Sequence, residues 1–164
     1  MSDRAVRREI SSVAIVGAGA MGAMYAVHVA EAGFDVSLVA TGERARRLAR
    51  DGIRVNGRHW TFPVTDPTSS TQPAPVDLVL VAVKAAQLAE AVELIAPLVD
   101  RDTTIISSLN GLDSEEALAA RYDPAQVLLS MAAGMETQRV DGQVQFRRVG
   151  RFSIGIDQRL TATA

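Results

Sequence analysis

Three glycines in the spacing G-x-G-x-x-G follow the first strongly apolar segment of this 164-residue chain. Residues 13–16 are apolar and mostly β-branched, and a helix-forming run covers about residues 21–32. A strand, a glycine loop and a helix in this order suit a dinucleotide pyrophosphate, because glycine allows the tight turn, the close approach of backbone to phosphate and the close packing of helix on strand. The alternative is a glycine-rich turn that binds no ligand. We expect the whole loop to bind the cofactor: Gly17, Ala18, Gly19, Ala20, Met21 and Gly22.

Strands and helices alternate along the rest of the chain. Further strands are expected at residues 36–40, 76–83, 103–108 and 127–131, and helices at residues 43–51, 85–99 and from Asp113 onward. Asp113 suits the cap of the last helix, with Glu116 at capping-box spacing, and Pro97 is expected to kink or close the helix before it. The alternation predicts a doubly wound, mostly parallel sheet with right-handed crossovers.

Turn signals predict two hairpins in addition. Asn56-Gly57 lies between two short β-prone runs in residues 53–62, and Asp141-Gly142 lies within residues 139–156. Asn-Gly and Asp-Gly are favoured in two-residue hairpin turns, which need positive φ. We expect the second hairpin to close the sheet, and the Pro-, Ser- and Thr-rich residues 63–75 to form a loop. The predicted fold class is α/β, a Rossmann-type sheet with a C-terminal antiparallel hairpin.

Ligands of such sheets bind at the carboxyl ends of the strands, so the residues that follow the strands are candidates for a site. Lys84 follows residues 76–83, and its ammonium can reach a phosphate, a ribose or a carboxylate and can polarise a carbonyl group. Asn110 follows residues 103–108, and its amide both donates and accepts hydrogen bonds. A surface lysine is the alternative for Lys84, but at a helix start its charge opposes the helix dipole, which favours a functional role. For Asn110, function and ordinary Asn-Gly turn chemistry both stay open.

The end of the second strand bears on the choice of cofactor. NAD-binding sheets usually carry Asp or Glu about 20 residues beyond the glycine loop, at the ribose hydroxyls. Here Thr41 follows residues 36–40, and Arg44 comes next with two further arginines beyond it. Arginine suits a 2′-phosphate, so the sequence favours NADP(H), with Thr41 and Arg44 as binding residues. Glu43 keeps NAD(H) open as the alternative.

Composition and charge exclude several other classes. Hydrophobic residues make up 48% and charged residues 22% of the chain, and the net charge is −2, without the basic excess of a nucleic-acid binder. There is no cysteine, and neither His28 nor His59 has metal-ligand spacing, so we expect no metal site. No apolar run approaches the ~20 residues of a membrane span, and residues 1–12 lack the apolar core of a secretory signal. We expect a cytoplasmic protein that contacts no membrane.

Four short motifs occur in order along the chain. They are Gly-Ala-Gly-Ala-Met-Gly at residues 17–22, Val-Lys-Ala-Ala-Gln at 83–87, Leu-Asn-Gly-Leu at 109–112, and a tail with Asp-Gly-Gln-Val and Phe-Ser-Ile-Gly. The combination resembles the ketopantoate reductase (2-dehydropantoate 2-reductase) family over nearly the whole chain. The resemblance implies hydride transfer from NADPH to the 2-keto group of ketopantoate, giving pantoate for pantothenate synthesis. It also implies that Lys84 and Asn110 line the nicotinamide and substrate end and support catalysis.

The resemblance implies further features. Family members commonly carry arginine where Thr41 stands, so Arg44 would supply the charge for the 2′-phosphate. The family has a second, helical domain with the main catalytic lysine and a substrate-binding glutamate, and we expect that domain to be absent and this chain alone to be inactive. The expected organisation is an N-terminal extension (1–11), an NAD(P)-binding domain (12–157) and a truncated linker (158–164). A small 2-keto acid is the expected substrate, and a homodimer is the expected assembly.

Two other functions stay open. A stand-alone NAD(P)-binding sensor would need no groups directed at a carbonyl, so Lys84 and Asn110 favour the reductase over a sensor. A reductase of related fold for another 2-keto or 3-hydroxy acid fits the same motifs, because the substrate pocket would lie mostly in the second domain.

Overall fold

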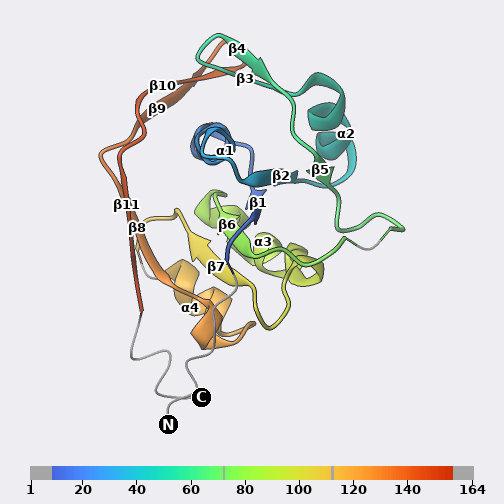
Figure 1. Cartoon of the computed structure of the whole chain (residues 1–164), viewed down its shortest axis with the longest axis vertical. Helices are drawn as coiled ribbons and strands as arrows, with labels where there is room; N and C mark the ends of the chain where they lie inside the picture. Colours follow the sequence, from blue (N-terminus) through green and yellow to red (C-terminus); the bar gives the residue numbers. More distant parts are fainter. Residues whose placement is uncertain (1–8, 72, 112, 157–164) are drawn as a thin grey trace.

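A five-stranded parallel sheet forms the centre of the molecule (Figure 1). The computed structural model describes residues 9–71, 73–111 and 113–156, so most of the expected N-terminal extension and all of the expected linker lie outside it. The chain moves outward from β1 to β2 and β5 and then returns to the other side of β1 at β6, which confirms the doubly wound sheet. In spatial order the strands are β5 (Val64–Thr65), β2 (Asp35–Val39), β1 (Ser12–Val16), β6 (Leu78–Val81) and β7 (Thr104–Ser107).

Each face of the sheet packs against different helices, because side chains alternate along a strand. Val13 and Ile15 of β1 belong to the cluster that contains α1 (Ala20–Glu31). Ala14 and Val16 belong to the cluster on the other face, with α3 (Leu88–Leu94) and α4 (Asp113–Ala119). The remaining helix, α2 (Gly42–Asp51), lies near β5 at the sheet edge (Figure 1).

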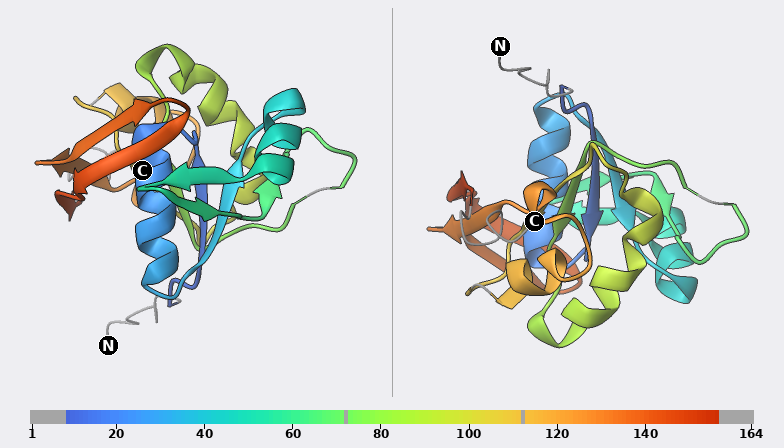
Figure 2. Two further views of the ribbon diagram at one scale, coloured as in Figure 1. Left: turned by 90° about the horizontal axis from the view of Figure 1, so that it is seen from above. Right: turned by 90° about the horizontal axis from the view of Figure 1, so that it is seen from below.

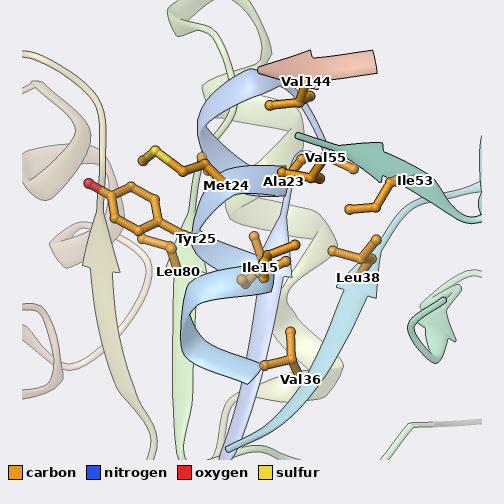
Figure 3. Packing of buried hydrophobic residues seen from close by; sticks show 14 of the residues in the cluster. Ile15, Ala23, Met24, Tyr25, Val36, Leu38, Ile53, Val55, Leu80 and Val144 are labelled. Carbon is orange, nitrogen blue, oxygen red and sulfur yellow. The ribbon is translucent and has the colours of Figure 1, made fainter. Parts of the chain in front are cut away.

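Helix α1 is buried on nearly all sides. Residues 22–27 are six consecutive buried residues, and Met24 has no exposed surface. Figure 3 shows Ile15 of the sheet packed against the helix, and Val55 and Val144, from strands outside the sheet, beside Ala23. A helix with one exposed face would carry polar residues along that face. The apolar sequence around α1 is therefore explained by a second layer that covers it.

The second layer is a long antiparallel hairpin, here called the ribbon (residues 129–155). Its strands pair in one continuous register from Gln143 opposite Val140 to Gly155 opposite Leu129, apart from a bulge between Phe146 and Arg148. The predicted hairpin and its Asp141-Gly142 turn are confirmed, but the ribbon crosses α1 instead of closing the parallel sheet (Figure 2). The strands are β8 (Leu129–Ala133), β9 (Glu136–Val140), β10 (Gln143–Arg148) and β11 (Arg151–Gly155).

A smaller hairpin extends this layer. β3 (Ile53–Val55) and β4 (Arg58–Trp60) pair around Asn56-Gly57, as predicted, and β3 also pairs with β10. The Asn56 side chain donates to the carbonyl oxygen of Phe146 at 3.1 Å and accepts from its N–H at 2.8 Å. The turn asparagine therefore joins the small hairpin to the ribbon as well as forming the turn.

Two of the expected elements differ in the structure. The helix expected at residues 85–99 is divided into η1 (Ala85–Gln87), α3 and η2 (Ala96–Leu98), and Pro97, which lacks an N–H, stands in the last piece. The strand expected at residues 127–131 pairs with β7 only through one bridge, between Val127 and Ile105. The N–H of Ser107, which could have continued that pairing, is bonded to Oγ of Ser130 at 3.0 Å. The chain then leaves the sheet and enters the ribbon.

Smaller differences concern residues 63–75 and Asp113. The segment expected as a loop contains the edge strand β5, which pairs with β2. α4 begins at Asp113 itself, so Asp113 is its first residue and not the residue before it. The short helix η3 (Pro124–Gln126) precedes Val127 and was not expected.

A buried carboxylate joins β1 to β6 at the amino-terminal edge of the sheet. Asp77 is 6% exposed, and its Oδ2 accepts hydrogen bonds from the N–H groups of Ser11 and Ser12 at 3.0 and 2.9 Å. The hydroxyl groups of both serines also donate to it. These bonds hold the pKa of Asp77 well below its usual value.

Candidate dinucleotide site

The glycine loop connects β1 to α1 at the carboxyl edge of the sheet. Gly17 has a φ of +98°, and a Cβ atom there would lie 2.7 Å from the carbonyl oxygen of Ala82. A Cβ atom on Gly22 would collide with the carbonyl oxygen of Gly17. The packing of the chain itself therefore requires two of the three glycines.

Nothing in the described chain requires glycine at position 19. Its φ is −76°, and apart from Gly19 and its two neighbours in the chain no described atom lies within 4 Å of a Cβ built on it. Gly19 is the N-cap residue of α1, and among the described residues no side chain caps the N–H groups of the first turn, which begins at Ala20. Open space above uncapped N–H groups fits a phosphate that approaches the backbone closely, so the loop fits a dinucleotide pyrophosphate.

Two side chains of β9 bind the glycine loop from the ribbon. Arg139 donates from Nη2 to the carbonyl oxygen of Ala18 at 3.1 Å, and Thr137 donates from Oγ1 to that of Ala20 at 3.4 Å. Arg139 stands opposite Val144, which is 1% exposed, so both lie on the ribbon face that points to α1.

These bonds orient the peptide groups of the loop. In a trans peptide the N–H points away from the carbonyl oxygen of the same unit. A carbonyl of Ala18 that is bound to the ribbon therefore directs the N–H of Gly19 away from the ribbon, toward the open side. The Arg139 guanidinium also polarises that peptide group, which strengthens its N–H as a donor.

A hollow of about 70 Å³ lies beside the loop, between the ends of β1 and β2 and the helices α2 and α3. Gly17, Thr41 and Arg44 line it together, as do Gln87 and Glu90. Arg44 is exposed and makes no ion pair with another described residue. Its charge is therefore available to an anion at this place.

Lys84 and Asn110 lie at the same edge of the sheet but outside that hollow. Lys84 follows β6 and directly precedes η1, and Asn110 follows β7 and precedes Gly111, whose φ is +91°. Both are exposed, and neither side chain is hydrogen-bonded to another described residue. Because β6 and β7 are neighbours, the two side chains are open to a ligand at adjacent strand ends.

A buried carboxylate supports the end of β7. Glu115 of α4 is 1% exposed, and it accepts from Oγ of Ser114 at 2.7 Å and from the N–H of Ser130 at 3.3 Å. Ser130 in turn donates from Oγ to the carbonyl oxygen of Ser107, at the end of β7. This network ties α4 and the start of the ribbon to the strand that leads to Asn110.

Sequence reasoning did not select several of these residues. Gln87 has a visible signal, since it ends the Val-Lys-Ala-Ala-Gln motif, but Glu90 and Glu115 have none. Arg139 lies 121 residues from Ala18, so no local pattern relates them. Asp66, which binds the first turn of α2, belongs to the segment expected as a loop.

Other features of the described residues give no competing site. A hollow of about 630 Å³ is lined by the Asn56-Gly57 turn and by residues of the ribbon, Phe146 and Thr137 among them, and it includes none of the residues predicted for the site. Among the residues that the structure describes, no group of His, Cys, Asp or Glu could hold a metal ion. Within the same residues, every helix is too short or too polar to span a membrane.

Comparison with known proteins identifies similar chains. A protein-family model described as ketopantoate reductase PanE/ApbA matches residues 13–158. A 2-dehydropantoate 2-reductase from Streptococcus pyogenes serotype M1 is 25% identical over 146 residues, which cover 87% of this chain and 47% of the relative. The chain spans less than half the length of the curated relatives it matches first.

Solved structures share the fold. The crystal structure of 2-dehydropantoate 2-reductase from Geobacter metallireducens GS-15 has a TM-score of 0.73 and 32% identity, covering 88% of this chain and 49% of that one. The ternary structure of D-mandelate dehydrogenase with NADH and anilino(oxo)acetate has a TM-score of 0.72 at 22% identity, covering 93% of this chain and 51% of that one. At that lower identity the likeness shows the fold alone.

Proposed function

Because the chain belongs to the ketopantoate reductase family, a family of oxidoreductases, we propose that it forms the cofactor-binding part of an NADPH-dependent reductase of 2-dehydropantoate. The observation that carries the proposal is the open space at Gly19. A side chain at this position would meet no other part of the described chain, and the space lies over the uncapped start of α1. The pyrophosphate would bind to the N–H groups of the loop, which Arg139 and Thr137 hold in place.

Arg44 and Thr41 support the assignment of NADP(H). Both line the hollow next to Gly17, where the adenosine ribose lies in this kind of sheet. The unpaired guanidinium of Arg44 would bind a 2′-phosphate, and the hydroxyl of Thr41 would donate to it. NAD(H) is the second candidate cofactor, since the first turn of α2 also carries a carboxylate, that of Glu43.

Lys84 and Asn110 would act at the opposite end of the cofactor. NADPH supplies the hydride when it is bound. The Lys84 ammonium would donate a hydrogen bond to the keto oxygen or carboxylate of a small 2-keto acid, which stabilises the negative charge that develops on the reduced oxygen. The Asn110 amide would orient the carboxamide or substrate by donating and accepting hydrogen bonds.

Titration of NADPH and NADH into the purified chain, followed by nicotinamide fluorescence and calorimetry, tests the proposal. We expect saturable binding, and we expect Gly19→Ala to weaken it at least tenfold, because the new methyl group would occupy the space that the phosphate needs. The unfolding free energy should change by no more than about 1 kcal/mol, the usual effect of alanine at an N-cap.

Gly155→Ala is the matched control, since Gly155 also has open space around its Cβ position and lies on the ribbon. It should bind both nucleotides as the unmodified chain does. Failure of the unmodified chain to bind either nucleotide would overturn the proposal.

A further inference from the structure

A carboxylate lies at the end of β2, although the sequence has none at that strand end. Asp66 directly follows β5, which pairs in parallel with β2 so that Val39 is opposite Thr65. Asp66 Oδ2 accepts a hydrogen bond from the N–H of Gly42, the first residue of α2, at 3.1 Å. The neighbouring strand therefore brings a negative charge to the place where NAD-binding sheets carry one on the second strand.

The Asp66 carboxylate is held in one orientation. Its Oδ1 accepts from the N–H of Thr68 at 3.0 Å and from the Thr68 hydroxyl at 2.6 Å, while Oδ2 binds Gly42. These hydrogen bonds, led by the Thr68 hydroxyl, lower the pKa of Asp66 below its usual value. At neutral pH the group is a fixed anion, and it cannot rotate away without losing all three bonds.

Asp66 lies next to the proposed ribose position. Thr41 and Arg44 line the hollow beside Gly17, and Gly42 stands between them in the chain. The Gly42 N–H already binds Asp66, so it is not free to donate to a 2′-phosphate. The helix start that would otherwise attract an anion is occupied by one that belongs to the chain.

The charges around this helix start are balanced. Arg46 is bonded to Glu43 at 3.0 Å, which leaves Arg44 as the cation of this turn that faces the hollow. Asp66 adds a negative charge at the same helix start, where its carboxylate accepts from the N–H of Gly42. A 2′-phosphate carries up to two negative charges and is repelled by Asp66, whereas the 2′-hydroxyl of NADH is neutral.

We propose that Asp66 is a specificity-determining residue of the dinucleotide site. It weakens binding of the 2′-phosphate of NADPH and leaves the binding of NADH unaffected. The affinity for NADPH relative to NADH is therefore lower than Arg44 and Thr41 alone would make it. The inference rests on the proposed function, because it requires that the ribose lies at Thr41–Arg44. It differs from that proposal in its test, which compares two nucleotides within one variant.

The variant Asp66→Asn removes the charge and keeps an oxygen that can accept from Gly42. We expect its dissociation constant for NADPH to fall about tenfold, with that for NADH unchanged, because only the phosphate senses the lost charge. Adenosine 2′,5′-bisphosphate should gain affinity in the same way, and AMP should not. The gain should shrink at 0.5–1 M salt, where the charges are screened within about 3–4 Å.

Asp102→Asn is the control, since Asp102 is an exposed carboxylate that precedes β7 at the opposite edge of the sheet. It should leave both dissociation constants unchanged. If the unmodified chain binds both nucleotides but Asp66→Asn leaves their ratio unchanged, or weakens both equally, the inference is wrong and the proposed function stands. If the unmodified chain binds neither, the proposed function itself fails.

Discussion

The chain contains two tyrosines, Tyr25 and Tyr122, whose hydroxyl groups differ in hydrogen bonding. The Tyr25 ring is 5% exposed and packs edge-on against Phe152, with centroids 5.4 Å apart, but its hydroxyl has no hydrogen-bond partner among the described residues. The Tyr122 hydroxyl donates to the carbonyl oxygen of Val92 and so links the turn after α4 to α3. Burial raises the pKa of both phenols, that of Tyr122 to about 12.

The same substitution should therefore have opposite effects at the two positions. Tyr25→Phe removes an unpaired buried oxygen and should raise the unfolding free energy by about 1 kcal/mol, while the ring contact with Phe152 remains. Tyr122→Phe leaves the carbonyl of Val92 without that donor and should lower the unfolding free energy by about 1 kcal/mol. Urea unfolding of the two variants measures both. An equal loss of unfolding free energy in both variants would contradict this prediction, because it would mean that the Tyr25 hydroxyl also makes a stabilising hydrogen bond.

At the scale of elements, the ribbon couples the glycine loop to the second half of the chain. Arg139→Met keeps most of the side-chain stem and removes the donor to Ala18. We expect it to weaken NADPH binding about fivefold to tenfold, because the peptide group before Gly19 loses the bond that orients it. Fluorescence titration measures the affinity, and thermal unfolding in parallel measures stability.

Arg148→Met is the matched control on the same ribbon. Arg148 is exposed and lies 3.7 Å from Glu136, an ion pair that contributes little at the surface. The affinity of Arg148→Met for NADPH should equal that of the unmodified chain. Equal losses in the two variants would mean that Arg139 acts only through net charge.

The local elements could be predicted from sequence because their signals are local. The glycine spacing, the valine and isoleucine runs and the Asn56-Gly57 and Asp141-Gly142 turns each predict one element, and these elements form. The sequence of α1 also carried a signal that was not used, because apolar residues on all sides of a helix indicate cover on both sides. That pattern would have predicted the ribbon over α1.

The contacts of the site could not be predicted, because they join residues that are distant in sequence. Asp66 reaches Gly42 only because β5 pairs with β2, and Arg139 reaches Ala18 only because the ribbon crosses α1. Strand pairing and packing between layers decide such contacts, and no periodicity within either segment specifies them. The glycine loop was recognisable, but the groups that surround it were not.

At the scale of the whole molecule, Asp77 joins the two halves of the sheet and should make the fold sensitive to acid. Its folded pKa lies below the usual 3.8, so its contribution is complete above about pH 5 and is lost as the pH falls from there toward the folded value. Asp77→Asn should lower the unfolding free energy at pH 7 by roughly 2–3 kcal/mol, because Ser11 and Ser12 lose a charged acceptor.

The difference in unfolding free energy between Asp77→Asn and the unmodified chain should stay constant from pH 7 to pH 5 and become smaller below pH 4. Urea unfolding at each pH, with exposed Asp102→Asn as control, measures this difference. A difference that does not change down to pH 2 would show that the Asp77 charge contributes nothing to stability.

The position of the ribbon also affects how the chain emerges from the ribosome. Helix α1 is made early, but Arg139, which binds the loop before it, is synthesised 121 residues after Ala18. At about ten residues per second, one side of an apolar helix stays uncovered for roughly ten seconds during translation. The nascent chain therefore exposes an apolar face of α1 until the ribbon has been synthesised.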